Sequence, residues 1–439
     1  VDHGEKGRRM KNIRFPWWAS PSTLLVISLL VVFYAIVFVD DEQYNIWKTP
    51  RYVTHVEAVE VGSVIVAVLL GIVVAASISQ RNNENYVADT AKFLKSRQLN
   101  TLFYIFTVLT IIGYSIWIIK AFHSGLTGAE VLATIKGDPG AVSQLKGTAQ
   151  PTAGLTTLTQ FGSLVVVLGI LRDRLAEKNS KLIVWFVLFL SVLRFVFYAE
   201  RIAFLEVAVP AVILAASLWP TKVRWPSARK WITNILPIVL GLFVFILFAV
   251  GEYSRSWAVL RTQTSQTYTE FIISRFLSYY ATATNNGVLY GRLADANNLD
   301  HTAFYAFYNL PGSFFGTDAV SGTNFDQWWG MQLELFANPS LTNTGTIFPL
   351  IGELSLATVL ILFFAVGYIS TVLFRQAKNG HLISMMAVPI LCYAFVELPR
   401  ISYLTLGRSV PIFLGILIMW FVFDLWKTTE RYTLKEQQQ

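Results

Sequence analysis

The sequence predicts an all-α integral membrane protein with about ten transmembrane helices and one large extracytoplasmic loop. Its composition leads to this fold class. Of the 439 residues, 54% are hydrophobic and only 14% are charged, whereas an ordinary soluble domain carries about 25% charged residues. The chain also holds 13 Trp and 18 Tyr, residue types that gather at the two surfaces of a bilayer. We therefore expect one polytopic membrane domain over residues 1–439.

Apolar runs long enough for a membrane helix, which needs about 20 residues, occur at ten places. They are 22–39, 61–79, 102–119, 152–171, 182–198, 201–218, 233–250, 346–374, 382–399 and 409–426. The first run follows a basic stretch, as the apolar part of a signal peptide does. Because Asp40-Asp41-Glu42 comes directly after it in place of a small-residue cleavage site, we expect it to remain as a span.

The boundary between the fifth and sixth runs is the least marked, because Phe197–Arg201 contains neither Gly nor Pro. One helix over 182–218 is the alternative, and it would invert the topology of all later spans. The basic residues at 222–230 favour two separate spans, because Lys and Arg concentrate on the cytoplasmic side. The same asymmetry, with an even number of spans, predicts that both termini are cytoplasmic.

Charge and cysteine content exclude several classes of function. The net charge is +8, but the basic residues lie between apolar runs and do not indicate nucleic-acid binding. The single cysteine, Cys392, forms no internal disulfide and does not by itself build a zinc or iron–sulfur site. Because the sequence also lacks a Gly-rich phosphate loop and a metal-ligand motif, we expect neither a metal nor another cofactor.

Two predicted outer loops are long. The loop at about 120–151 contains Gly137-Asp138-Pro139-Gly140, and we expect it to be partly ordered. The loop at 251–345 is the largest feature outside the predicted membrane region. It opens with a polar run, Glu252–Tyr280, for which we expect a helix, and continues with an aromatic and Gly-rich stretch at 305–329. Long loops tend to carry function, which makes this loop the first place to search for a site.

From the fifth span onward, the predicted outer segments carry arginine and no lysine. These arginines are Arg194, Arg201, Arg255, Arg261, Arg275, Arg292, Arg400 and Arg408. Because the planar guanidinium matches phosphate and carboxylate bidentately and ammonium does not, the set favours a site for an anion such as pyrophosphate. For any one of them, a helix-end contact with lipid phosphates is the alternative.

Arg194 lies about one turn inside the outer interface, where a charged side chain needs a partner or a wet cavity. Arg194, Tyr198 and Arg201 share one face if the helix continues through them. The candidate partners for Arg194 are Glu200, Glu206 and Glu397. A structural ion pair and a functional site are equally consistent with this pattern.

Two acidic residues lie near the outer ends of predicted spans, where such residues usually face the interior of the bundle. Glu353 is near the outer end of the eighth span, and Glu397 precedes Arg400 near the outer end of the ninth. Either carboxylate could hold an arginine or take a proton from a hydroxyl group. His301 is the one histidine of the large loop, and it is either a solvated side chain or a base.

Several stretches resemble the oligosaccharide repeat-unit polymerases, the O-antigen polymerase (Wzy-type) family. Residues 341–354 (LTNTGTIFPLIGEL) resemble the end of that family's large outer loop and the start of the next span. Residues 199–205 (AERIAFL) resemble the family's arginine at the outer start of a middle span. The loop stretches 252–257 and 275–280 resemble its Arg and Tyr positions. The resemblance covers roughly residues 150–400.

The resemblance implies a GT-C-like, metal-independent glycosyltransferase of the bacterial cytoplasmic (inner) membrane. Such an enzyme passes a growing glycan from undecaprenyl pyrophosphate to the next lipid-linked repeat unit, on the outer side of the membrane. Its partners would be this lipid-linked oligosaccharide, the bilayer, a chain-length regulator and a flippase. The polymer would be an O-antigen, a capsule or an exopolysaccharide. The implied pyrophosphate-binding residues are Arg194, Arg201, Arg255, Arg275, Tyr280 and Arg400, and the implied catalytic acids are Glu353 and Glu200.

Two other functions remain open. An O-antigen ligase shares this architecture, but it is expected to have a histidine just before the span that follows the large loop, where this chain has Asn343-Thr344. A secondary transporter or flippase is expected to have paired broken spans in two related halves. The sequence has no such internal pairing, and its ionisable residues gather toward the outer ends of the later spans.

Overall fold

The computed structural model describes residues 13–78, 86–136, 138, 141–149, 151, 154–198, 201–219, 226–257, 261–262, 266–297 and 319–436. Within these ranges the chain is helical and forms no β-strand. Eight helices are long and apolar enough to cross a membrane. They are α2 (Pro21–Phe38), α4 (His55–Ser77), α6 (Arg97–His123), η2 with α9 (Leu155–Leu175), α10 (Lys181–Tyr198), α12 (Pro226–Glu252), α19 (Leu356–Lys378) and α21 (Val410–Glu436). The predicted multi-pass, all-α membrane protein is confirmed at this level.

The two other predicted spans form shorter helices, α11 (Arg201–Ser217) and α20 (Leu382–Glu397). The 16 residues of α20 extend only about 24 Å at 1.5 Å per residue, less than the hydrocarbon core of about 30 Å. Most of its side chains are buried, so other helices surround it. Its short length is tolerated because it meets protein along its sides.

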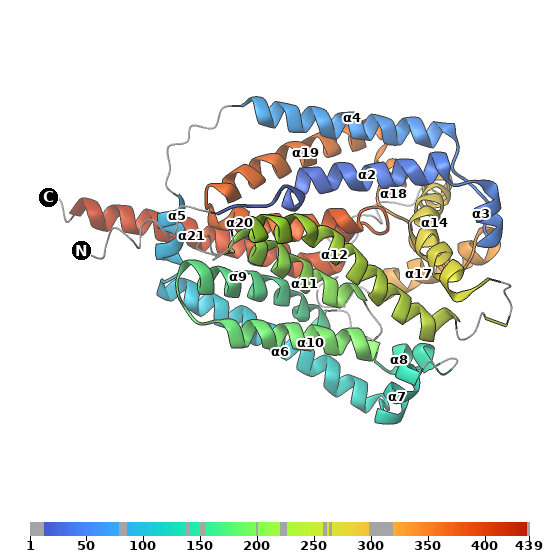
Figure 1. Ribbon diagram of the computed structural model, residues 1–439, viewed down its shortest axis with the longest axis horizontal. Helices are drawn as coiled ribbons and strands as arrows, with labels where there is room; N and C mark the ends of the chain where they lie inside the picture. Colours follow the sequence, from blue (N-terminus) through green and yellow to red (C-terminus); the bar gives the residue numbers. More distant parts are fainter. Residues whose placement is uncertain are drawn as a thin grey trace.

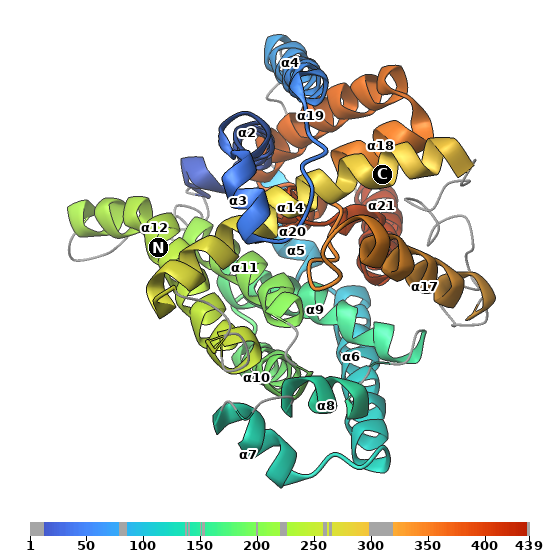
Figure 2. The same ribbon diagram turned by 90° about the vertical axis from the view of Figure 1, so that its right-hand side faces the viewer.

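Figure 1 shows the long helices running in roughly one direction. One end of the bundle carries α5 (Tyr86–Phe93) and the C-terminal part of α21. The opposite end carries the helices between the spans, which are α3 (Asp41–Ile46), α7 (Gly128–Lys136), α8 (Ala141–Thr148), α14 (Tyr268–Asn297), α17 (Ala319–Phe336) and α18 (Ile347–Leu354). In Figure 2, α12 lies at the edge of the bundle, and it is the least buried of the eight candidate spans.

The fifth and sixth predicted spans are separate helices. Helix α10 ends at Tyr198, α11 begins at Arg201, and the two pack against each other. The alternative of one continuous helix over 182–218 is therefore wrong. Consequently Arg194 and Arg201 lie on different helices, and the helical spacing that would have placed them on one face does not apply.

The predicted span 346–374 is wrong as a single helix. It divides at Ser355, whose φ of +78° interrupts the helical backbone between α18 and α19. Tertiary packing explains the break, because α18 lies against α14 at a closeness that only glycine permits. A Cβ on Gly352 would collide with the backbone of Gly291. Helix α18 therefore follows α14 and does not continue the direction of α19.

The large predicted loop, 251–345, is mostly helical where the structure describes it. The expected helix over 252–280 begins at Tyr268 and continues to Asn297 as α14. Its second half is anchored by two adjacent amides. Asn285 accepts hydrogen bonds from the backbone N–H groups of Tyr52 and Val53, and Asn286 donates to the carbonyls of Leu341 and Asn343. Helix α14 is thus held in place by two loops.

We predict that Gly352→Ala destabilises the protein by about 1–3 kcal/mol, because the new Cβ meets backbone that cannot move aside. The matched control is Gly62→Ala, since Gly62 is also helical and has no neighbour within 4 Å. This control should be neutral or more stable by about 0.4–1 kcal/mol. Unfolding of both variants in mixed detergent micelles measures the difference, and equal stabilities would contradict the close α14–α18 contact.

Candidate functional site

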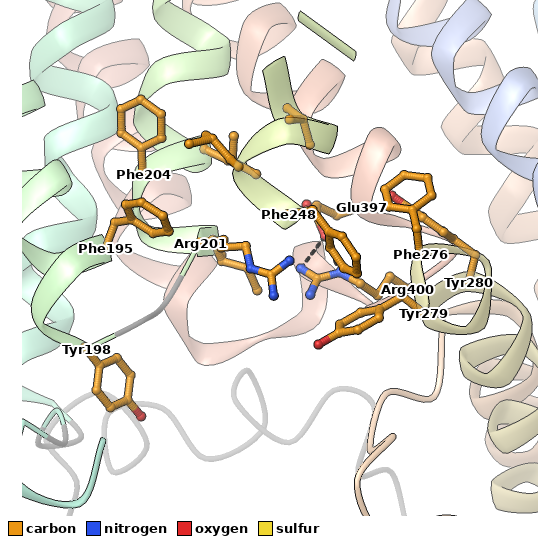
Figure 3. Close-up of a pocket in the computed structure, with 14 residues that line it drawn as sticks. Phe195, Tyr198, Arg201, Phe204, Phe248, Phe276, Tyr279, Tyr280, Glu397 and Arg400 are labelled. Atoms are coloured by element: carbon orange, nitrogen blue, oxygen red, sulfur yellow. Dashed lines mark hydrogen bonds and ion pairs between the residues drawn. The ribbon is translucent and has the colours of Figure 1, made fainter. Parts of the chain in front are cut away.

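A cavity of about 270 Å³ lies at the end of the bundle that carries α14. Its walls come from α10, α11, α12, α14 and the turn that follows α20 (Figure 3). One end of the cavity is polar, and its lining residues there are Arg201, Tyr279, Tyr280, Glu397 and Arg400. The apolar residues of the lining include Phe195, Ile202, Phe204, Leu205, Val244 and Leu247, and in Figure 3 Phe195 and Phe204 lie on the other side of Arg201 from Tyr280. The cavity therefore joins a charged region to an apolar region between α11 and α12.

A fully buried carboxylate, Glu252, organises the polar end. Its Oε1 accepts a hydrogen bond from Arg201 Nη2 at 2.6 Å and another from the Tyr279 hydroxyl at 3.2 Å. Its Oε2 accepts from the Ser256 hydroxyl at 2.6 Å and lies 3.5 Å from Arg275 Nε. Because a buried carboxylate is stable only when it is paired and hydrogen-bonded, these four side chains determine where it lies.

The local backbone explains the contact with Ser256. Helix α12 ends at Glu252 and continues as one π-helical turn, η3 (Tyr253–Trp257). This turn places the Ser256 hydroxyl on the carboxylate of Glu252, four residues earlier. The apolar residues of α12 end one residue before Glu252, so the charge lies at the end of the predicted span. An isolated charge is less costly there than at the centre of a span.

Arg400 is held by Glu397, three residues earlier. Its Nε and Nη2 both donate to Glu397 Oε2, at 2.9 and 2.6 Å. Burial, the largest single influence, lowers the pKa of Arg400, but the Glu397 carboxylate together with smaller contributions from Tyr393 and Tyr280 raises this pKa above its ordinary value, so the guanidinium is charged. In Figure 3 the guanidinium groups of Arg201 and Arg400 point toward one another.

The charges of this cluster do not cancel. Arg201, Arg275 and Arg400 contribute three positive charges, and Glu252 and Glu397 contribute two negative ones. One net positive charge remains among these described side chains, and Arg201 and Arg400 both reach the cavity. An anionic group in the cavity would balance it. Guanidinium groups that converge in this way suit a phosphate or pyrophosphate.

Aromatic side chains form much of the remaining wall at the polar end. The Arg201 guanidinium lies 4.5 Å from the centre of the Phe248 ring, which supports its charge on one side. Burial raises the pKa of Tyr280 to about 12, and the Glu397 carboxylate adds to the shift. Tyr280 is therefore a neutral phenol at physiological pH, and its hydroxyl makes no hydrogen bond to any group that the structure describes. It remains able to donate to a ligand.

The predicted pyrophosphate-binding residues separate into three groups. Arg201, Tyr280 and Arg400 line the cavity together. Arg275 contacts Glu252 behind the cavity wall, and Arg194 is buried elsewhere, where it donates to Thr159 Oγ1 at 2.6 Å. The backbone of Arg255 belongs to η3, but its side chain lies outside the described residues.

Neither of the two predicted catalytic acids is among the described residues that line the cavity. Glu353 lies in α18, where its Oε1 accepts a hydrogen bond from the Tyr290 hydroxyl at 2.6 Å. Glu200 lies outside the described residues, as does His301. Glu397, which the sequence indicated only as a partner or a base, is the acid that lines the cavity alongside Arg201 and Arg400.

Other outer arginines have acidic partners of their own, a feature that the sequence alone did not reveal. Arg292 pairs with Glu57 at 2.7 Å, and Arg408 pairs with Glu206 at 3.1 Å. The arginines of the predicted outer segments therefore do not form one large anion-binding site. Most of these residues are in structural ion pairs, and two open onto the cavity.

Residues 341–354 do not line the cavity, but they form hydrogen bonds with the elements that do. Asn286 of α14 donates to the carbonyls of Leu341 and Asn343. Thr346 donates to the carbonyls of Leu398 and Ile401, which flank Arg400. Gly345 has a φ of +63°, and its N–H donates to the Arg400 carbonyl at 3.0 Å. This segment thus joins α14 to the turn that carries Glu397 and Arg400.

Sequence reasoning did not single out Glu252 or Tyr279 as site residues. The sequence did place Glu252 directly at the end of a long apolar run, where an acidic residue is a candidate for pairing inside the bundle. Tyr279 gave no comparable signal, since its role depends on the approach of α14 to the end of α12. No group of three or more His, Cys, Asp or Glu side chains that could hold a metal ion occurs in the described parts of the chain.

Comparison with known proteins does not add to this picture. The chain matches no protein-family model, no curated protein and no solved structure.

We predict that Glu252→Ala destabilises the protein by about 3–5 kcal/mol, because it leaves Arg201 and Arg275 buried without their shared carboxylate. Asp41→Ala is the matched control, since Asp41 pairs with Arg51 at 3.2 Å but is 79% exposed. Its effect should not exceed about 1 kcal/mol. Detergent unfolding curves compare the two, and a small effect of Glu252→Ala would contradict the central role of this carboxylate.

Proposed function

We propose that this protein polymerises lipid-linked oligosaccharide repeat units. It transfers the growing glycan from undecaprenyl pyrophosphate to the next lipid-linked unit on the outer side of the bacterial cytoplasmic membrane. The observation that carries the proposal is the cavity itself, in which Arg201 and Arg400 face one another and apolar side chains of α10, α11 and α12 form much of the remaining wall.

The chemistry of the substrate matches both parts of this cavity. A prenyl pyrophosphate combines a charged head with a long apolar chain, and it enters a protein from the bilayer. The polar end supplies guanidinium donors for the pyrophosphate. The apolar end lies between α11 and α12, and α12 is the least buried of the candidate spans, so this wall is close to lipid.

The main requirement of the proposed reaction is stabilisation of the negative charge on the leaving group. As the bond between the anomeric carbon and the pyrophosphate breaks, negative charge builds on the leaving oxygen. Arg201 and Arg400 are already oriented by Glu252 and Glu397, so they can stabilise this charge without rearrangement. The Tyr280 hydroxyl adds a neutral donor at the same end. The site would also align the acceptor with the donor.

The proposed orientation follows from charge and from the position of the site. The cavity lies at the end of the bundle opposite α5 and the C-terminal part of α21. With the basic inter-span segments on the cytoplasmic side, this cavity end is extracytoplasmic. A flippase that delivers lipid-linked units and a chain-length regulator would act with the protein there.

Deletion of the gene in its host tests the function directly. If the protein is a polymerase, the deletion strain should carry surface glycan of single repeat units only. Alternatively, the surface glycan should disappear while single lipid-linked repeat units accumulate. Accumulation of long lipid-linked polymer would instead indicate an O-antigen ligase, which acts after polymerisation. Unchanged surface glycan and lipid-linked pools would overturn the glycosyltransferase proposal and leave a secondary transporter or flippase as the alternative.

We predict that Arg201→Lys and Arg400→Lys each lower polymerisation about 10–100-fold, because a lysine keeps the charge but loses the planar donor geometry. Arg51→Lys is the matched control, since Arg51 lies at the same end of the bundle, near α3, and pairs with the exposed Asp41. Complementation of the deletion strain, with glycan length resolved on gels, measures the effect. Full activity of both cavity variants would count against pyrophosphate binding there.

A further inference from the structure

The two oxygens of Glu397 are used unequally. Both donors of Arg400 converge on Oε2, and Oε1 makes no hydrogen bond to any group in the described part of the chain. An ion pair that served only to hold an arginine would be expected to use both oxygens against the two parallel N–H groups. Here Oε2 accepts both hydrogen bonds from Arg400. Oε1 remains able to accept a hydrogen bond from a ligand, because Glu397 lines the cavity.

The other carboxylates near the site differ from Glu397 in their hydrogen-bond partners or in their position. Glu252 has both oxygens occupied, by Arg201 and Tyr279 on one side and by Ser256 and Arg275 on the other. Glu353 bonds to Tyr290 and is not part of the cavity wall. Among the described acids, Glu397 alone combines a place in the wall, a fixed carboxylate and an oxygen without a protein donor.

The position of Glu397 relative to the guanidinium groups also suits proton removal. Arg400 holds the carboxylate in place, and Arg201 faces Arg400 across the polar end. A pyrophosphate between the two guanidiniums would place the anomeric carbon of the donor next to Glu397. An acceptor hydroxyl that approaches this carbon then meets Oε1 within the same small cavity.

On this geometry, and resting on the polymerase function proposed above, we propose that Glu397 is the catalytic base for the acceptor sugar. Its Oε1 takes the proton of the acceptor hydroxyl as that oxygen bonds to the anomeric carbon of the donor glycan. The bond from this carbon to the pyrophosphate oxygen breaks, and its electron pair leaves with undecaprenyl pyrophosphate. Arg201 and Arg400 neutralise the charge that the leaving group gains, and Glu397 later releases its proton to water.

The test uses purified full-length protein in lipid nanodiscs with lipid-linked repeat units as substrate. Glu397→Gln keeps the shape of the side chain and still accepts hydrogen bonds from Arg400, but it cannot take a proton. We expect kcat to fall about 10²–10⁴-fold. Binding of undecaprenyl pyrophosphate should not weaken, because the guanidiniums remain in place and one negative charge beside them is removed. Glu42→Gln, an exposed acid in α3, is the control and should be fully active.

The dependence of kcat on pH separates catalysis from positioning. In the wild-type protein kcat should decline at acid pH, and the residual rate of Glu397→Gln should lack this decline. Equal loss of binding and of kcat would make Glu397 only a positioning residue for Arg400 and overturn the inference. Wild-type rates in Glu397→Gln would overturn it while leaving the polymerase function intact. Absence of polymer with the wild-type protein would overturn the function itself, and this inference with it.

Discussion

The ion pairs of the buried Glu252 carboxylate are the constraint on which the site depends. A carboxylate without solvent must be met by donors on every side, and here the donors come from two helices and one turn. Arg201 begins α11, Arg275 and Tyr279 belong to α14, and Ser256 lies in the turn after α12. Since these elements are far apart in the sequence, pairing Glu252 fixes their relative positions. The cavity is the space that remains between them.

At the end of the bundle that carries α14, most of the described arginines have a carboxylate partner. Glu57, Glu206 and Glu397 each pair with one arginine, and Glu252 pairs with two. Such pairs add little net stability, because desolvation offsets most of the attraction. They do, however, hold the guanidiniums in place. Where the pairing leaves an excess of one positive charge beside a cavity, a structural arrangement becomes suitable for binding an anion.

The sequence predicted the spans well and the site only in part, for a physical reason. Apolar runs and basic flanks are local, so α2, α6 and α10 lie close to where composition indicates. The break at Ser355 depends on the contact between Gly291 and Gly352, which no local pattern records. Arg201, Tyr280 and Arg400 were expected in one site and do line one cavity. Glu353 and Arg194 were expected there too, but each is engaged by a different neighbour, Tyr290 or Thr159.

The two sides of the cavity differ in the number of contacts that hold them in place. Helix α14 is fixed by Asn285, Asn286 and the close contact of α18. The turn with Glu397 and Arg400 is fixed in turn by Gly345 and Thr346. Helix α12, in contrast, lies at the edge of the bundle and is little buried apart from its end at Glu252. Glu397 and Arg400 therefore lie on the side that these contacts hold, and the ion pairs of Glu252 join the end of α12 to both α11 and α14.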